Sequence, residues 1–245
     1  MIKKTFILFF LLLLVAYLAV AFTRLNSKPA DAVCRDVIFN IASVEKSEFI
    51  TAAELKKELQ KGGLYPKDKK ISQINCRKIE EYLMKNPFIK NAECYTSPTH
   101  KLCVDITQRI PVVRIMGSNG ENFYMDEQGE IMPCGSYAVH LPVVTGNITR
   151  KNAGYMLKEL NACLLNDTFW NSQIEQIHVT PAQELEIVPR VGDHIVFLGK
   201  PKDIADKLEK LKAFYTRALN KVGWNKYSRI NLEFSNQIIC TKKEK

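Results

Sequence analysis

The sequence has none of the short motifs that mark the common catalytic sites. It contains no GxSxG nucleophile elbow, no P-loop, no HExxH zinc helix and no GxGxxG dinucleotide fingerprint. Because an enzyme needs a site whatever its fold, these absences argue against catalysis. Asp126 and Glu130 flank a turn and could form an acid-base pair, but turn carboxylates are far more often solvated, which is what we expect here. The sequence therefore yields no catalytic residue.

Cysteine and histidine are present but too scattered to indicate a metal site. The seven cysteines include no CxxC pair, and the four histidines do not have the spacing of zinc ligands. We predict no metal and no other cofactor. Most cysteines are expected to be small buried residues, although one or two long-range bridges are possible in an oxidising compartment. Strand alternation places Cys94 and Cys103 on opposite faces, so a bond between them is not expected.

The charge balance is basic, with a formal net charge of +9. Such a balance fits nucleic acid, anionic lipid or an acidic partner. The sequence has no RNP, zinc-finger or helix-turn-helix signature, and its lysines are spread along the chain. We therefore interpret the charge as a solvated basic surface and predict no nucleic-acid partner.

An uncharged, strongly apolar run follows Lys3 and Lys4 and extends to Phe22. It is long enough to cross a hydrocarbon core as a helix. A cleaved signal peptide is the competing interpretation, because Ala19-Val20-Ala21 has a small-x-small pattern. The run from Phe6 exceeds the usual signal core of about 7–15 residues, which favours a retained anchor. We predict a cytoplasmic tail over 1–4, a transmembrane helix over 5–23 and a linker over 24–34.

The next part of the chain predicts the element order β-α-α-β-β. A strand near 37–41 precedes a helix over 52–61, for which Thr51 and Glu54 supply a capping box. A second helix begins at Ser72 or Asn75 and ends before Asn86-Pro87, since proline cannot continue it. Two alternating strands then form an antiparallel hairpin that turns at 97–100.

Beyond a turn at 116–120, the pattern predicts a mixed domain with more strands than helices. Ile230, Leu232 and Phe234 alternate on one face of its last long strand, Tyr227–Phe234. The expected elements are a hairpin over 122–133, a short strand over 141–146, a helix over 151–166, strands at 174–179, 184–188 and 194–198, a long helix from 203, and the closing strands at 227–234 and 235–240.

The run NPFIKNAECYTSPTHKLCVDITQRIPVVR, from Asn86 to Arg114, resembles the POTRA domain of the FtsQ/DivIB family of bacterial cell-division proteins. The segments beginning at Asn122 and at Tyr227 resemble the start and the closing strand pair of the family's β domain. The resemblance implies an α+β fold, comprising a single N-terminal transmembrane helix, a β-α-α-β-β POTRA domain over 35–116, and a mixed β-rich domain with two helices over 117–242, followed by a tail over 243–245.

The resemblance also implies a function. It suggests a non-enzymatic scaffold of the divisome, in the inner membrane at the septum with most of the chain periplasmic. The implied partners are FtsB/DivIC-like and FtsL-like single-pass division proteins, bound partly by strand addition at the C-terminal β edge. Candidate partner-binding residues, carried over by position, are Tyr227, Asn231, Phe234, Asn236, Gln237 and Ile239; Arg109, Pro111 and Arg114 are interaction candidates of the POTRA domain.

Two questions stay open at this point. The ring of Phe234 could face a partner or fill the core of its own domain. The protein could instead be a POTRA-containing accessory factor for outer-membrane protein assembly or secretion, or a secreted hydrolase with a hidden site. The absence of a C-terminal run of membrane strands argues against a transporter.

Overall fold

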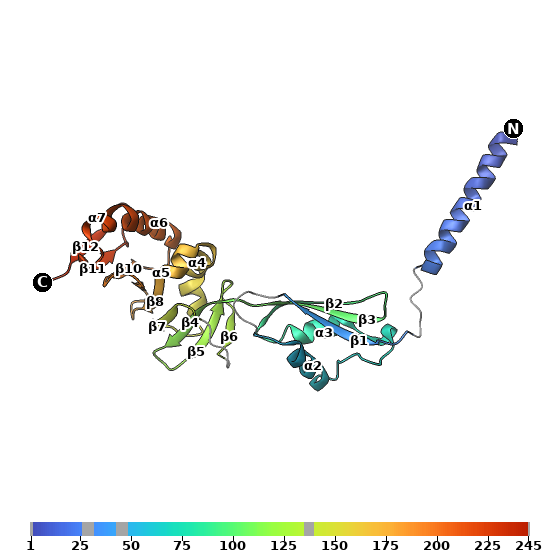
Figure 1. Cartoon of the computed structure of the whole chain (residues 1–245), viewed down its shortest axis with the longest axis horizontal. Helices are drawn as coiled ribbons and strands as arrows, with labels where there is room; N and C mark the ends of the chain where they lie inside the picture. Colours follow the sequence, from blue (N-terminus) through green and yellow to red (C-terminus); the bar gives the residue numbers. More distant parts are fainter. Residues whose placement is uncertain (1, 26–31, 43–48, 135–139, 245) are drawn as a thin grey trace. The chain divides into compact units, whose positions relative to one another are not determined.

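The computed structural model describes residues 2–25, 32–42, 49–134 and 140–244. The described residues include most of both predicted domains. Residues 26–31 of the predicted linker lie outside them. The chain divides into two compact units (Figure 1). The first consists of Met1–Ala42, Thr51–Lys85 and Asn91–Thr107, and the second of Ser43–Ile50, Asn86–Lys90 and Gln108–Lys245. Each unit is described by itself below.

The N-terminal helix α1 (Ile2–Leu25) contains the apolar run of the sequence. Its side chains are described over residues 9–22, and the large apolar ones among them are more than half exposed, including Phe10 at 71% and Phe22 at 73%. Among the helices in the described part of the chain, none combines the length and hydropathy that crossing a bilayer requires.

The first unit is built on a three-stranded sheet with the order β1-β3-β2. Its strands are β1 (Asp36–Ile41), β2 (Ile89–Thr96) and β3 (Lys101–Gln108). The first strand runs parallel to the central one, with Phe39 opposite Val104. Two helices, α2 (Ala52–Lys61) and α3 (Cys76–Leu83), stand between β1 and β2 in the chain. The predicted order β-α-α-β-β is therefore confirmed.

Local signals set the ends of both helices. The Thr51 side chain accepts from the Glu54 N–H, and the Glu54 carboxylate accepts from the Thr51 N–H at 2.9 Å, so the predicted capping box is present. Asn75 caps α3 by accepting from the Lys78 N–H at 3.0 Å. The helices bury Leu55 and Leu59 from α2 and Ile79 and Leu83 from α3, and the sheet buries Leu102, Val104 and Ile106.

The second unit is built on a single nine-stranded sheet with the order β12-β11-β10-β9-β8-β7-β4-β5-β6. Parallel pairs join β4 to β7, β7 to β8 and β10 to β11, and the other neighbours are antiparallel. The strands are β4 (Pro111–Gly117), β5 (Asn122–Asp126), β6 (Ile131–Pro133), β7 (Val143–Gly146), β8 (Ile174–Val179), β9 (Leu185–Pro189), β10 (Ile195–Gly199), β11 (Tyr227–Asn231) and β12 (Ile239–Lys242).

The position of β4 changes the predicted domain boundary. The sequence predicts a first domain that extends to residue 116, whereas β4 lies inside the nine-stranded sheet, paired with β5 and β7. Its residues Val112, Val113 and Ile115 are buried in the core of the second unit. Continuous apolar residues of this kind fit a strand covered on both faces, which the alternation pattern of the preceding hairpin did not reveal.

Helices complete the second unit. The two predicted long helices are present as α4 (Ala153–Asn166) and α6 (Ile204–Phe214), and two short helices, α5 (Thr168–Gln173) and α7 (Asn220–Val222), were not predicted. A π-helical turn, Tyr215–Leu219, continues α6. The apolar residues along one face of the two segments are all buried: Ile204, Leu208, Leu211, Tyr215 and Leu219. The core packs Leu157 and Leu160 of α4 and Leu208 and Leu211 of α6 with the strands.

Candidate interaction surface at the closing strands

The last strand, β12, lies at one end of the nine-stranded order. It pairs with β11 on one side, with Ile230 opposite Cys240 and Asn231 opposite Ile239. Within the described residues no strand lies on its other side. Ile239 is 45% exposed, while Ile238 and Cys240 pack against the core. The sheet therefore ends in a strand that has one open backbone edge and one exposed apolar side chain.

Phe234 lies outside both closing strands, which corrects the predicted strand Tyr227–Phe234. The ladder ends at Asn231, whose side-chain oxygen accepts from the Glu233 N–H at 2.8 Å. Such a local side-chain bond offers the backbone an alternative to the ladder. Leu232 is completely buried, as the alternation predicted, but Phe234 is 46% exposed. The interpretation in which its ring fills the core is therefore wrong.

A lysine side chain of α6 is hydrogen-bonded to the backbone of the connection between β11 and β12. Lys210 donates from Nζ to the backbone oxygens of Ser235 at 2.8 Å and of Phe234 at 3.5 Å. Leu232 donates its N–H to the Phe197 oxygen of β10 at 2.9 Å. These contacts fix the backbone on both sides of Phe234 and leave its ring outside the core.

The structure brings four of the six predicted partner-binding residues together. Phe234, Asn236 and Gln237 are exposed in the connection, and Ile239 is exposed in β12. We call these four side chains and the open edge of β12 the closing-strand surface. The other two candidates are engaged within the fold, because Tyr227 is half-buried beside Phe214 and Asn231 caps the following turn.

Basic side chains of and next to the closing strands form ion pairs within the fold. Arg229 of β11 crosses β10 to reach Glu186 of β9 at 2.8 Å, with its guanidinium 4.7 Å from the Phe197 ring centroid. Lys243 pairs with Asp193 at 3.0 Å. Sequence reasoning missed Lys210 and Arg229, because their contacts join residues 24 to 43 positions apart and no local pattern reports them.

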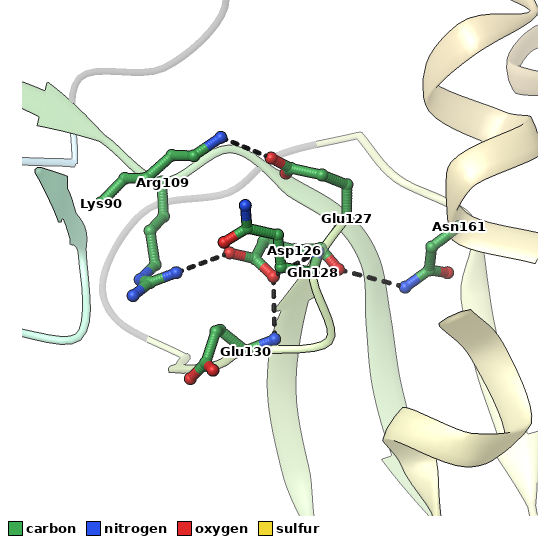
Figure 2. Close-up of polar contacts among 7 residues, drawn as sticks. All are labelled: Lys90, Arg109, Asp126, Glu127, Gln128, Glu130 and Asn161. Carbon is green, nitrogen blue, oxygen red and sulfur yellow. Dashed lines mark hydrogen bonds and ion pairs between the residues drawn. The ribbon is translucent and has the colours of Figure 1, made fainter. Parts of the chain in front are cut away.

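The three POTRA interaction candidates lie at or next to β4 and are largely occupied. The Arg109 guanidinium contacts Asp126 at 2.9 Å, Pro111 is buried, and Arg114 donates from Nε to Asn122 at 3.1 Å. Arg109 and Asp126 belong to the polar cluster in Figure 2, at the turn between β5 and β6. None of the three presents the kind of exposed, unengaged side chain that the closing-strand surface does.

Asp126 is completely buried, which corrects the expectation of a solvated turn carboxylate. It accepts from the N–H groups of Gln128 and Glu130 at 2.9 and 2.8 Å, in addition to Arg109 (Figure 2). Asn161 of α4 donates to its backbone oxygen at 3.3 Å. A carboxylate held by three donors is fixed in place and suits a structural role.

A second ion pair at this turn is more exposed. Lys90 donates to Glu127 at 2.7 Å (Figure 2). Partial burial opposes the charge of Glu127, but the hydrogen bond from Lys90, together with the Glu127 backbone N–H and the charge of Arg109, lowers the pKa of Glu127 below its ordinary value.

Among the described residues, no group of three or more His, Cys, Asp or Glu side chains could hold a metal ion.

The fold and this surface define a class of protein, one with a POTRA-like domain followed by a β-rich domain that ends in an open strand. Family comparison agrees with both parts. Residues 32–107 match the POTRA-like domain, and residues 110–241 match the family model described as FtsQ/DivIB, C-terminal related. The second match includes more than half of the chain. The chain belongs to the FtsQ/DivIB family of cell-division proteins.

A named relative supports the same assignment. The chain is 26% identical over 181 residues to the cell division protein FtsQ of Geotalea daltonii, a match that includes 69% of this chain. The chain spans 64% of the length of that relative. The matched boundaries also place β4 with the second domain, as the sheet does.

Proposed function

We propose that the protein is a non-enzymatic scaffold of the divisome that links early and late division proteins during septum formation. The closing-strand surface binds a single-pass FtsB/DivIC-like partner, which adds a strand to the open edge of β12. An FtsL-like protein joins through that partner. The observation that carries the proposal is the combination of an end strand with an exposed Phe234 and Ile239 beside it.

The free energy of binding requires both the open backbone edge and the apolar side chains of this surface. Strand addition along β12, a strand of four residues, would add a few ladder bonds worth about 0.5–1.5 kcal/mol each. Micromolar binding needs about 8 kcal/mol after the costs of association. Backbone pairing alone therefore falls short, and apolar anchors must supply the rest. Phe234 and Ile239 offer the exposed apolar area.

We propose α1 as the membrane anchor of this scaffold on the basis of its apolar sequence, although the described residues by themselves contain no helix that is long and apolar enough to cross a bilayer. Its 24 residues would extend about 36 Å as an ideal helix, compared with about 30 Å for a hydrocarbon core. Its described side chains are apolar and exposed, a state that is costly in water and favourable in lipid. With α1 in the inner membrane, the two units lie in the periplasm at the septum.

Site-specific photo-crosslinking in dividing cells tests the proposal. A photo-activatable residue replaces Phe234, and a matched control replaces Lys151, which is exposed near the start of α4. We expect the Phe234 probe to capture a small single-pass division protein and the Lys151 probe to capture none. A third probe at Ile239 should capture the same protein, because it lies on the same surface.

The result that would overturn the proposal is equally specific. If probes at Phe234 and Ile239 crosslink only within the chain, or capture no division protein, the closing-strand surface is not the partner site. Capture of outer-membrane assembly proteins by probes at Arg109 or Arg114 would support the accessory-factor alternative. That alternative otherwise has only the POTRA-like domain in its favour, and the family match of the second domain does not favour it.

A further inference from the structure

Two thiols of the first unit lie near each other, one on α3 and one on β2. Cys76 is the first residue of α3, and Cys94 lies within β2. Their side chains lie close enough to influence each other's ionisation, and both are partly exposed free thiols. Cys103, the nearest cysteine to Cys94 in the sequence, is buried and is hydrogen-bonded to Tyr95. The proximity of Cys76 to Cys94 therefore distinguishes this pair from the hairpin pair considered in the sequence analysis.

A backbone contact independently holds the same helix face against the same strand position. Glu80 follows Cys76 by one helical turn and so lies on the same face of α3. Its carboxylate accepts from the Cys94 N–H at 2.7 Å. This bond places one face of α3 beside Cys94 of β2, and Cys76 lies on that same face one turn earlier.

We propose that Cys76 and Cys94 form an oxidation site, at which a thiol-disulfide oxidant converts the two thiols to an intramolecular disulfide that ties α3 to β2. The inference goes beyond the scaffold function and does not depend on it, since both residues lie within one unit. The oxidant is any molecule that carries a reactive disulfide, either a low-molecular-weight compound such as glutathione disulfide or a protein with an oxidised dithiol.

The reaction balances as two consecutive exchanges. The Cys76 thiol loses its proton, and its sulfur attacks one sulfur of the oxidant, which forms a mixed disulfide and releases the first thiol of the oxidant. The Cys94 sulfur then loses its proton and attacks Cys76, which releases the second. The two cysteines together lose two protons and two electrons, and the oxidant gains them.

The order of attack follows from the surroundings of Cys94. Burial, together with the hydrogen bond from Cys76 and the nearby charges of Cys76 and Glu80, raises the pKa of the Cys94 thiol. A thiol held in its protonated form is a poor first nucleophile. The mixed disulfide therefore forms on Cys76, and Cys94 ionises only for the second attack, which takes place within the chain.

The bond would restrain the first unit. It closes the loop that contains most of α3, the Asn86-Pro87 turn and the start of β2, and a loop of this size loses substantial entropy in the unfolded chain when it is closed. The helix and strand are already in contact in the reduced protein, so the bond requires little rearrangement. Oxidation is therefore expected to slow local opening of α3 and β2.

Peptide mapping of the full-length chain in detergent tests the proposal. The reduced protein is treated with glutathione disulfide, its free thiols are alkylated, and the protein is digested with trypsin. Cleavage at lysine and arginine places Cys76 in peptide 71–77, Cys94 in 91–101 and Cys103 in 102–109, so each bond is identified separately. We expect peptides 71–77 and 91–101 to be linked, with two hydrogen atoms lost.

Variants and hydrogen exchange provide the controls. C76S and C94S should each abolish the linked peptide, and C163S, which alters a thiol of the second unit, should retain it. Amides of α3 and β2 should exchange about tenfold more slowly after oxidation of the native protein and unchanged after the same treatment of C76S. Alkylation of both cysteines in the treated native protein, or a link from Cys94 to Cys103, would overturn the proposal.

Discussion

Arg109 and Asp126, 17 residues apart in the chain, form an ion pair of 2.9 Å in which the carboxylate is completely buried and the guanidinium is 16% exposed. The pair joins Arg109, two residues before β4, to the end of β5, and two backbone N–H groups complete the carboxylate's hydrogen bonds. Arg109 is thus committed to the turn of its own fold, although sequence reasoning offered it as a residue for a partner.

Removal of Asp126 is expected to destabilise the second unit strongly. In Asp126→Ala, the largely buried Arg109 charge and two N–H groups lose their acceptor, and breaking a buried pair costs about 3–5 kcal/mol. The matched control is Lys90→Met, which removes the more exposed ion pair of the same turn and should cost less than about 1 kcal/mol.

Urea unfolding followed by tryptophan fluorescence measures this difference. Both tryptophans, Trp170 and Trp224, lie in the second unit, so the signal reports that unit. Equal losses in Asp126→Ala and Lys90→Met would show that burial does not distinguish the two ion pairs.

Phe234→Ala should weaken partner binding without weakening the fold. The ring is 46% exposed, so its removal leaves no cavity, whereas loss of a central aromatic anchor weakens binding by roughly tenfold or more. Titration against the protein captured by crosslinking measures the effect. Tyr155→Ala is the control, since this aromatic is 75% exposed on α4, away from the closing-strand surface. A similar loss of affinity in both variants would contradict the assignment.

Lys210→Met should loosen the connection that presents Phe234. The substitution keeps an apolar side chain of similar length but removes the donor to the oxygens of Phe234 and Ser235. We expect faster hydrogen exchange at residues 233–238 and a smaller loss of affinity than in Phe234→Ala. Lys212→Met removes a different ion pair of α6, with Asp167, and should leave exchange at 233–238 unchanged. Unchanged exchange in Lys210→Met would show that other contacts hold the connection.

His194 is expected to make the second unit less stable in mild acid. Burial lowers its pKa below the ordinary value, although the Trp224 backbone and the charge of Asp193 act in the opposite direction. Below about pH 6.5 the unfolded chain binds a proton at this residue that the folded chain resists. Stability is therefore lost as the pH falls below about 6.5, and the loss ends once the folded protein is also protonated.

Unfolding free energies between pH 7 and 5 test this sign. His194→Gln keeps a group that can bond with Tyr215, whose hydroxyl lies 2.8 Å from Nε2 of His194, and should show a shallower pH dependence than the native chain. His100→Gln, in the first unit, is the control and should retain the native slope for the second unit. A steeper slope in His194→Gln would contradict the prediction.

Thr51→Ala should destabilise the first turn of α2 by about 1 kcal/mol, since it removes the side-chain acceptor of the capping box. Hydrogen exchange at the amides of residues 52–55 should become roughly fivefold faster. Glu54→Gln is the matched control, because glutamine can also complete a capping box and should produce a smaller change. Equal effects would show that the charge of Glu54, and not the box geometry, stabilises the turn.

The elements of the first unit could be predicted from the sequence because their signals are local. Thr51 and Glu54 lie three residues apart, Asn75 caps a helix within its own first turn, and Asn86-Pro87 follows the end of α3 after two residues. The polar and apolar alternation of the hairpin likewise depends on neighbours in the chain. The same locality explains why the order of motifs was sufficient to identify the family.

The candidate site was predicted only in part. Sequence order placed Phe234 near the closing strands, but its side chain leaves the ladder because Asn231 binds the Glu233 N–H and Lys210 holds the following oxygens. The first of these contacts is local and could have been inferred from the preference of asparagine for turns. The second depends on the packing of α6 beside the connection, which no short pattern encodes.

By itself, then, the sequence determined the helix ends, the strand hairpins and the family, since each follows from bonds between residues a few positions apart. Only the tertiary structure decided that β4 lies between β7 and β5, that Asp126 is buried against Arg109, and that Glu80 of α3 is bonded to the backbone of Cys94. Burial and contact of this kind depend on which distant segments pack together, and that choice minimises exposed apolar area over a whole unit and is not fixed by any one stretch.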